Sequence, residues 1–431
     1  EMKIKKDILI KYIVIILSFM AIEVLIMSTD GILIHILGLV AFSAVAIIMS
    51  DLDLMHPYTW FSAFFCLYSI GFPILTYLGK ENLRAAYSKE LMVIQLLAFF
   101  VILFCIGPQK NTNELIREKH NINLGIFNKI LYAGMIFILL GAILFLGRSD
   151  FAGKASIYAS GNLILLAVFR IPLILTMLYT LLIVSAWINT NKISFITLII
   201  TGLSLLGITM YSGERDFIFR FLIISVIFLC FTGKLKKKHL IMLVPLAISI
   251  LILSDKYKYF LSTVVINNST ENIILRLFSG EFESAGTNLQ VVINSGMKYS
   301  LGFERYVSDV LSIFIPNISS VTSWFTNTFY LGNTVQYGFT LIGEGYVTGG
   351  IVGVILISCI VGFIIKIFYR NFNRSIYWFS AYLYLITVII YSIRMDLGTI
   401  LAAIVKQIGL VLFIVVMIEQ ISKIKPVRLK I

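Results

Sequence analysis

The sequence predicts an all-α, polytopic membrane protein with about twelve transmembrane helices. The chain has 431 residues, of which 59% are hydrophobic and only 13% are charged, whereas soluble chains carry about 25% charged residues. Apolar runs of about 20 residues, long enough to cross a bilayer as helices, recur along the chain. The runs are continuous and do not alternate with a period of two, which argues against a β-barrel. We therefore treat residues 1–431 as a single polytopic membrane domain.

Hydropathy and helix-breaking residues delimit the expected spans. In chain order the spans are Ile8–Met27, Gly31–Ser50, Tyr58–Leu78, Glu90–Ile106, Ile126–Leu146, Leu163–Trp187, Ile193–Tyr211, Phe217–Phe231, Leu240–Ser254, Phe339–Phe368, Ile376–Ile393 and Leu397–Ile418. No signal-peptide cleavage pattern precedes the first span, so we expect it to remain as an anchor.

Basic residues in the loops predict how the chain crosses the membrane. Lysines and arginines gather near both termini and in three loops, around residues 110–119, 234–238 and 366–374. All of these segments fall on one side of the predicted topology, and the short loops of the other side carry fewer basic residues. The positive-inside rule therefore places both termini in the cytoplasm. The net charge of +13 has its explanation in these loops and does not indicate a nucleic-acid partner.

One outer loop, residues 255–338, is far longer than the others and longer than an ordinary connection. It is rich in aromatic and β-branched residues, so its composition is not that of a disordered segment. A Ser-Thr-Glu helix start stands at 269–271, and Gly302 and Pro316 bracket a second short helix, Phe303–Ile315. We expect amphipathic helices that lie over the outer mouth of the bundle, and long structured loops usually carry function.

The cysteines and histidines show no metal-binding pattern. The four cysteines lie in separate apolar runs, and the four histidines are scattered without an HExxH spacing. We expect no bound metal and no cofactor.

The first candidate site is the outer turn with the sequence SGERDFIFR, residues 212–220. Arg215 lies beside the N-terminus of the next helix, where backbone amides and a guanidinium together can bind phosphate. Arg220 lies one turn deeper and four residues after Asp216. That spacing suits either an anion contact or a local ion pair.

Two further candidates carry carboxylates. In the long loop, Arg276 precedes Glu283, which suggests either anion binding with a hydroxyl contact by the glutamate, or a helix-surface pair of little energetic value. Glu344 opens a span within the glycine-rich segment LIGEGY. A carboxylate at the edge of a span should face protein or water, and Glu344 could serve as a general base or as an orienting group.

Three more arginines lie near the outer ends of spans. Arg170 and Arg305 could each belong to an anion-binding site or make only structural contacts. Arg394 could likewise bind an anion or form a local ion pair with Asp396. Several arginines without metal ligands indicate an anionic, phosphorylated substrate that is handled without a bound cation.

Three segments carry a resemblance to a known family. They are HPYTWFSAFFCLYSIGFPI, SGERDFIFRFLI, and the block from LRLFSGEF through GFERYVSDVLSIFIPNI to GFTLIGEGYVTGGIVGV. With them the chain resembles the bacterial oligosaccharide repeat-unit polymerases, the Wzy-type O-antigen and capsule polymerases. The resemblance covers most of the chain and includes a long outer loop before a span that opens with an acid.

The resemblance implies a membrane glycosyltransferase with a GT-C-like helical fold on the outer face of the bacterial cytoplasmic membrane. Such enzymes move a growing glycan from undecaprenyl diphosphate onto the sugar end of a new lipid-linked repeat unit, and a chain-length regulator can be a partner. By position, the resemblance makes Arg215, Arg276 and Glu344 the expected catalytic residues. The expected substrate-binding residues are Arg170, Arg220, Arg305, Glu283 and Arg394.

Two other functions stay open at this stage. A flippase or transporter for lipid-linked oligosaccharides has a similar size, although such folds usually show internal repeats and this chain shows none. A glycan ligase of similar architecture would attach the finished chain to another acceptor. Ligases of that type resemble this chain less, because they usually rely on an outer-loop histidine and residues 255–338 contain none.

Overall fold

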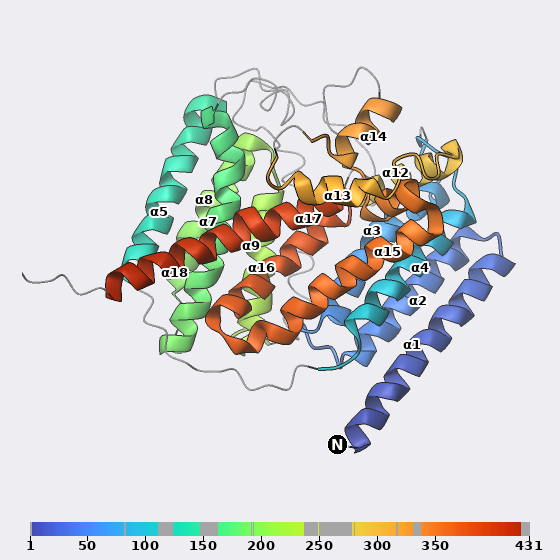
Figure 1. Ribbon diagram of the computed structural model, residues 1–431, viewed down its shortest axis with the longest axis horizontal. Coiled ribbons are helices and arrows are strands. Elements are labelled where there is room, and N and C mark those ends of the chain that lie inside the picture. Colours follow the sequence, from blue (N-terminus) through green and yellow to red (C-terminus); the bar gives the residue numbers. More distant parts are fainter. Residues whose placement is uncertain are drawn as a thin grey trace, which may run out of the picture.

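The protein is described here from a computed structural model. It describes residues 2–81, 83–110, 124–146, 163–190, 194–236, 281–315, 318–330 and 338–423, with a few isolated positions between them. Every regular element in these ranges is a helix (Figure 1). Nine helices in the described part of the chain are long and apolar enough to cross a membrane. The predicted class, a polytopic α-helical membrane protein, is confirmed.

The helices follow the predicted spans closely. In the first half of the chain they are α1 (Met2–Ser28), α2 (Ile32–Met49), α3 (Pro57–Tyr77), α4 (Lys89–Ile106), α5 (Leu124–Gly141) with the π-turn η1 (Ala142–Leu146), α7 (Leu163–Thr190), α8 (Phe195–Ser212) and α9 (Asp216–Phe231). In the second half they are α12 (Glu281–Ser295), α13 (Glu304–Leu311), α14 (Val321–Phe329), α15 (Leu341–Asn371), η3 (Phe372–Arg374), α16 (Ile376–Ser392), α17 (Leu397–Ala403), η4 (Ile404–Gly409) and α18 (Leu410–Lys423). The predicted span Leu240–Ser254 lies outside the described residues.

Local chemistry explains several helix ends. The side chains of Ser194 and Ser375 cap α8 and α16 by accepting hydrogen bonds from backbone amides at the start of each helix. α3 begins with Pro57 in its first turn, where no donor is lost, and His56 caps it through Nδ1. α8 ends at Gly213, whose φ of +69° is a conformation that favours glycine.

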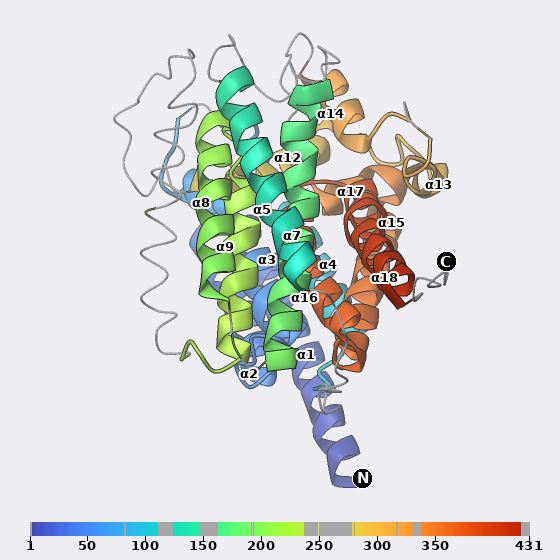
Figure 2. The ribbon, with the colours of Figure 1, turned by 90° about the vertical axis from the view of Figure 1, so that its left-hand side faces the viewer.

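The helices form two groups joined by the C-terminal helices (Figures 1 and 2). α1 to α4 pack together on one side, and α5, α7, α8 and α9 pack together on the other. α15 packs along α4, whereas α16 packs against α7 and α9. Buried aromatic rings fill both halves, such as Phe42 against Phe99 and Phe228 against Phe379. The core is therefore largely apolar, and the few charged side chains buried in it point to the candidate site.

The short helices α12, α13 and α14 all lie at one end of the bundle, opposite the N-terminus (Figure 1). We call this the α12–α14 end. The turns between α8 and α9 and between α16 and α17 lie at the same end (Figures 1 and 2). The expected helix Phe303–Ile315 is present as α13, which is shorter: it begins one residue later and ends at Leu311, four residues earlier. The expected helix after residue 269 lies outside the described residues.

α12 does more than cover the bundle, because it packs into it against α3. A Cβ added at Gly71 of α3 would lie 2.3 Å from a backbone atom of Phe282, and one at Gly286 would lie 2.8 Å from Phe72. Glycine at both places lets the two backbones approach closely. The long loop is therefore built into the end of the bundle by close helix contact.

The predicted span Phe339–Phe368 is not one continuous helix. Its backbone leaves helical geometry at Gly349 and Gly350, where Gly350 has φ +58° and ψ −138°, values open only to glycine. A Cβ at Gly353 would overlap the carbonyl oxygen of Gly345, so the two parts of α15 fold closely against each other. Residues 351–371 alone reach about 30 Å, enough to cross a membrane. Residues 341–348 form a separate short helix at the α12–α14 end.

Candidate functional site

A buried arginine lies near the start of α9. Arg220 is 3% exposed, and its Nε is 2.9 Å from both carboxylate oxygens of Asp216, one helical turn earlier. Its guanidinium carbon also lies 5.7 Å and 5.2 Å from the ring centroids of Tyr384 and Tyr391 on α16. Arg220 Nη1 has no hydrogen-bond acceptor among the described residues. The predicted ion pair is present, and Nη1 is a buried donor beside the two tyrosine rings.

A second arginine meets the same aromatic ring. The guanidinium carbon of Arg394 is 4.9 Å from the ring centroid of Tyr391, so Tyr391 contacts two cations that lie 174 residues apart in the chain. Two like charges repel each other unless a counter-charge is near. Asp216 neutralises one of them. The two guanidinium groups and the ring between them, which we call the Arg220–Tyr391–Arg394 cluster, bring together planar N–H donors of the kind that bind anions.

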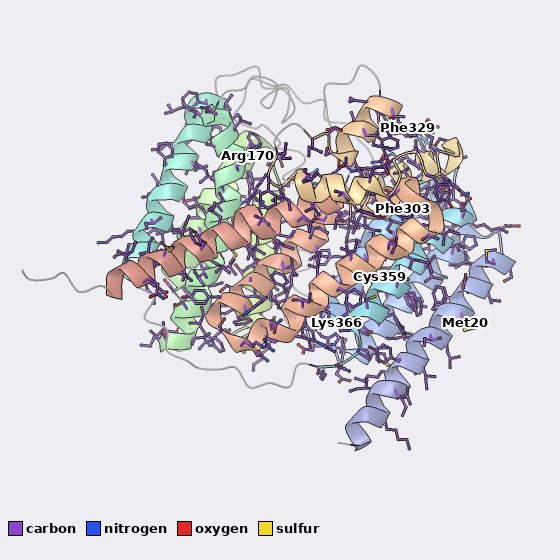
Figure 3. The ribbon with its side chains drawn as sticks, in the orientation of Figure 1. Met20, Arg170, Phe303, Phe329, Cys359 and Lys366 are labelled. Carbon is purple, nitrogen blue, oxygen red and sulfur yellow. The ribbon has the colours of Figure 1, made fainter. Side chains whose placement is uncertain are left out.

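Arg215 and Arg170 lie on neighbouring elements. Arg215 is the N-cap residue of α9 and is partly exposed, directly before Asp216. Arg170 on α7 is exposed, and the adjacent Phe169 contacts the ring of Phe217 in the first turn of α9. Figure 3 shows Arg170 at the α12–α14 end. The structure therefore brings these two predicted residues to the same end as the cluster.

The turn that carries Arg394 is held in place by Glu344. Glu344 is fully buried, and its Oε2 accepts a 2.7 Å hydrogen bond from the backbone nitrogen of Leu397, the first residue of α17. The backbone nitrogen of Leu341 donates to the carbonyl oxygen of Ile393. The short first part of α15 thus fixes both sides of the α16–α17 turn.

Two further acids gather around Glu344. Asp396 caps α17 by accepting from the backbone nitrogen of Thr399 at 2.9 Å, and it also accepts from Thr322 Oγ1 at 2.9 Å. Asp309 of α13 is fully buried and interacts with both Glu344 and Asp396. Three carboxyl groups from three elements therefore meet under α13, and we call them the acid cluster.

Two carboxyl oxygens of the acid cluster are buried without a hydrogen-bond partner among the described residues, Asp309 Oδ2 and Glu344 Oε1. The two side chains interact with each other. Two close, buried carboxyl groups are expected to hold one proton between them. Burial raises the pKa of Asp309, although Glu344 and Arg305 beside it favour the ionised form.

Arg305 pairs with the acid cluster and is not part of the Arg220–Tyr391–Arg394 cluster. It is 8% exposed, forms a short ion pair with Asp309 one turn later on α13, and donates from Nη1 to the carbonyl oxygen of Ser319 at 2.7 Å. These contacts hold α13 to the segment before α14. Arg305 was predicted to bind substrate, and the structure shows its structural contacts.

Glu283 and Arg276 complete the predicted set. Glu283 Oε2 lies 2.9 Å from Lys80 Nζ, which joins α12 to the segment after α3. Arg276 lies outside the described residues. In the described part of the chain, no group of three or more His, Cys, Asp or Glu side chains is arranged to hold a metal ion.

Sequence reasoning missed three residues at this end. Asp309 could have been found from its spacing of four residues after Arg305, which predicts an ion pair on one helix face. Tyr391 and Tyr384 carry no such signal, because tyrosine near the end of a span is common in any membrane protein. Their importance comes only from which arginines they contact.

Comparisons of the chain with protein-family models, with curated proteins and with solved structures give no match.

Proposed function

We propose that the chain is a bacterial membrane glycosyltransferase that polymerises undecaprenyl-diphosphate-linked oligosaccharide repeat units and releases undecaprenyl diphosphate. The observation that carries the proposal is the Arg220–Tyr391–Arg394 cluster at the α12–α14 end. A leaving diphosphate is the kind of anion that two fixed guanidinium groups stabilise. The resemblance to repeat-unit polymerases, with its GT-C-like architecture, supports the same function.

The reaction needs one bond to form as another breaks. The acceptor hydroxyl oxygen bonds to the anomeric carbon of the donor sugar, and the bond from that carbon to the phosphate oxygen breaks. The hydroxyl proton passes to a base, and the diphosphate leaves with the bonding electron pair. Arg394, which is partly exposed, would stabilise the charge that builds on the diphosphate, with Arg215 and Arg170 as further contacts from the same end. The buried Arg220 would add positive charge from behind Tyr391. No step in this scheme calls for a metal ion.

Glu344 fits the role of an orienting group better than that of a base. Its carboxylate is fully buried under α13 and accepts from Leu397 N, three residues after Arg394. An acceptor hydroxyl would reach it only after α13 moved aside. We therefore assign Glu344 as a positioning residue for the turn that carries Arg394.

The proposed orientation places the α12–α14 end on the outer face of the cytoplasmic membrane. Basic residues lie at the opposite end, where Lys110 pairs with Asp51 at 2.7 Å and Arg370 donates to Gln109. Figure 3 shows Lys366 toward that end, away from Arg170. Excess positive charge marks the cytoplasmic side. Both termini would then be cytoplasmic.

One observation favours a second function, a flippase for lipid-linked oligosaccharides. α15 is broken at Gly349 and Gly350, and transporters often build their substrate sites from broken helices. The break in this chain lies next to α13, however, and the Arg220–Tyr391–Arg394 cluster lies on α9, on α16 and in the turn between α16 and α17. The polymerase is the function that uses the cluster.

The test is polymerisation in reconstituted vesicles with the lipid-linked repeat unit, with products separated on a gel. We expect a ladder from the parent chain and none from Arg394→Ala or Arg215→Ala. Arg374→Ala is the matched control, because Arg374 is an exposed arginine at the opposite end, and it should keep the ladder. Transport of the repeat unit across the vesicle without a ladder would replace the polymerase with the flippase.

A further inference from the structure

α13 has its polar side chains inside and its apolar side chains outside. Arg305 and Asp309 face the protein and are buried. On the opposite side of the same helix, Val307 is 61% exposed and Val310 48% exposed. A helix on a water-facing surface has the reverse pattern, with polar residues outward. The pattern of α13 is the one expected where the outer environment is lipid.

The orientation of α13 is set by several contacts. Arg305 pairs with Asp309 and donates to Ser319, as described above. Tyr306 Oη donates to the carbonyl oxygen of Gly353 at 3.1 Å. The helix therefore cannot rotate its apolar side inward without breaking the hydrogen bonds from Arg305 to Ser319 and from Tyr306 to Gly353, and without separating Asp309 from Glu344. Breaking such contacts of buried groups is unfavourable.

The apolar side of α13 continues into the exposed surface of a membrane span. The ring of Phe303, at the start of α13, packs against Gly349 at the break in α15. Directly after the break, Ile351 and Val352 are 57% and 56% exposed, and they begin the part of α15 that is long enough to cross the membrane. Figures 1 and 2 show α13 at the flank of the bundle beside α15 and α17. One apolar surface thus extends from the span onto α13.

The exposed side of α13 has a single polar edge. Glu304 is exposed, and it lies one residue after Phe303 and three before Val307 on the helix. A helix in the membrane interface needs such an edge, because one side of its exposed surface meets headgroups and water while the other meets acyl chains. If water surrounded α13 on both sides, six apolar side chains of the helix and its ends would be exposed to it without a physical reason. They are Phe303, Val307, Val310, Leu311, Phe314 and Ile315.

We propose that α13 is an interfacial helix that binds the lipid bilayer, with Phe303, Val307 and Val310 against the acyl chains of the leaflet at the α12–α14 end. The acid cluster beneath it anchors α13 to the turn that carries Arg394. This inference does not depend on the proposed glycosyltransferase activity, since it concerns only where the helix lies.

The test measures lipid and water contact at single positions of the full chain in phosphatidylcholine vesicles. Val307→Cys, labelled with bimane, is made in a background whose four native cysteines are alanine. Nitroxide groups on the acyl chains report lipid contact, and iodide reports water contact. Glu304→Cys is the control for the polar edge, and Val352→Cys is the reference for lipid.

We expect acyl-chain nitroxide to quench the label at 307 about as strongly as at 352, and iodide to quench it several-fold less than at 304. The proposal is overturned if iodide quenches 307 as efficiently as 304 and the nitroxide lipid has no effect. Should the cysteine-free background not fold, Val307→Asp in the native chain provides the second measurement. It should lower the unfolding temperature in vesicles, whereas Glu304→Asp should not. An unchanged unfolding temperature for Val307→Asp would also reject lipid contact.

Discussion

Replacing Glu344 separates its structural role from a catalytic one. In Glu344→Ala, the buried backbone N–H of Leu397 loses its 2.7 Å acceptor, which costs about 1 to 3 kcal/mol. The lost methylene adds about 1 kcal/mol, and Asp309 is left without the partner of its shared proton, at about 1 kcal/mol more. We expect a total destabilisation of about 4 kcal/mol.

Glu344→Gln is the matched variant, because it keeps both contacts. The amide oxygen of glutamine can accept from Leu397 N, and its NH2 group can donate to Asp309 Oδ2, which has no donor among the described residues. We expect Glu344→Gln to change the stability by about 1 kcal/mol or less. It should also keep the polymer ladder, since an orienting group needs no exchangeable proton.

The assay compares apparent unfolding temperatures of parent, Glu344→Ala and Glu344→Gln in one detergent at one heating rate, because membrane proteins seldom unfold reversibly. At about 2 °C per kcal/mol, Glu344→Ala should unfold roughly 8 °C below the parent. Equal losses in both variants would refute the proposed hydrogen bonding. A stable Glu344→Gln that makes no polymer would refute the orienting role and restore Glu344 as the base.

Three other outcomes follow from single contacts. Gly350→Ala forces alanine into φ +58° and ψ −138° and should lower the free energy of unfolding by about 1 to 3 kcal/mol. The control is Gly233→Ala, where φ is +72° and the space is open, and it should lose clearly less. Equal losses would contradict a strained break in α15. Arg220→Ala leaves the half-buried Asp216 carboxylate without its partner and should cost about 3 kcal/mol. Most of that loss should return in the double variant Asp216→Asn, Arg220→Met. No recovery would reject the ion-pair account. Burial lowers the pKa of His56 from 6.5 to about 3. Between these values the folded state binds fewer protons than the unfolded state, so the free energy of unfolding falls as the pH drops. The parent should lose about 2 kcal/mol of stability between pH 7.5 and 5 from this group, and His56→Asn should not lose it; a pH profile identical to that of the parent would contradict this.

The membrane class and most helix positions could be predicted because hydropathy is a local property. A span needs about 20 apolar residues wherever it lies in the fold, so counting along the chain found α1 to α5, α7 to α9 and the C-terminal helices within a few residues. The helix at Phe303–Ile315 was also predicted from a local signal, its flanking glycine and proline.

The candidate site was predicted as a set of residues but not as an arrangement. Arg220 and Arg394 were both singled out as outer charges near span ends. Their common partner, Tyr391, could not be, since it joins them only through the packing of α9 against α16. Arg305 was grouped with the other arginines, yet its contacts are with Asp309 and Ser319.

By itself, the sequence determined the membrane class, the position of most apolar helices and the type of residue near their ends, because each of these follows from the composition of about 20 neighbouring residues. Only the tertiary structure decided that Glu344 lies buried with Asp309 and Asp396, that α15 breaks at Gly350, and that α13 turns its apolar side outward. Those features depend on which side chains meet across helices far apart in the chain. Residue spacing along one helix carries no information about that meeting.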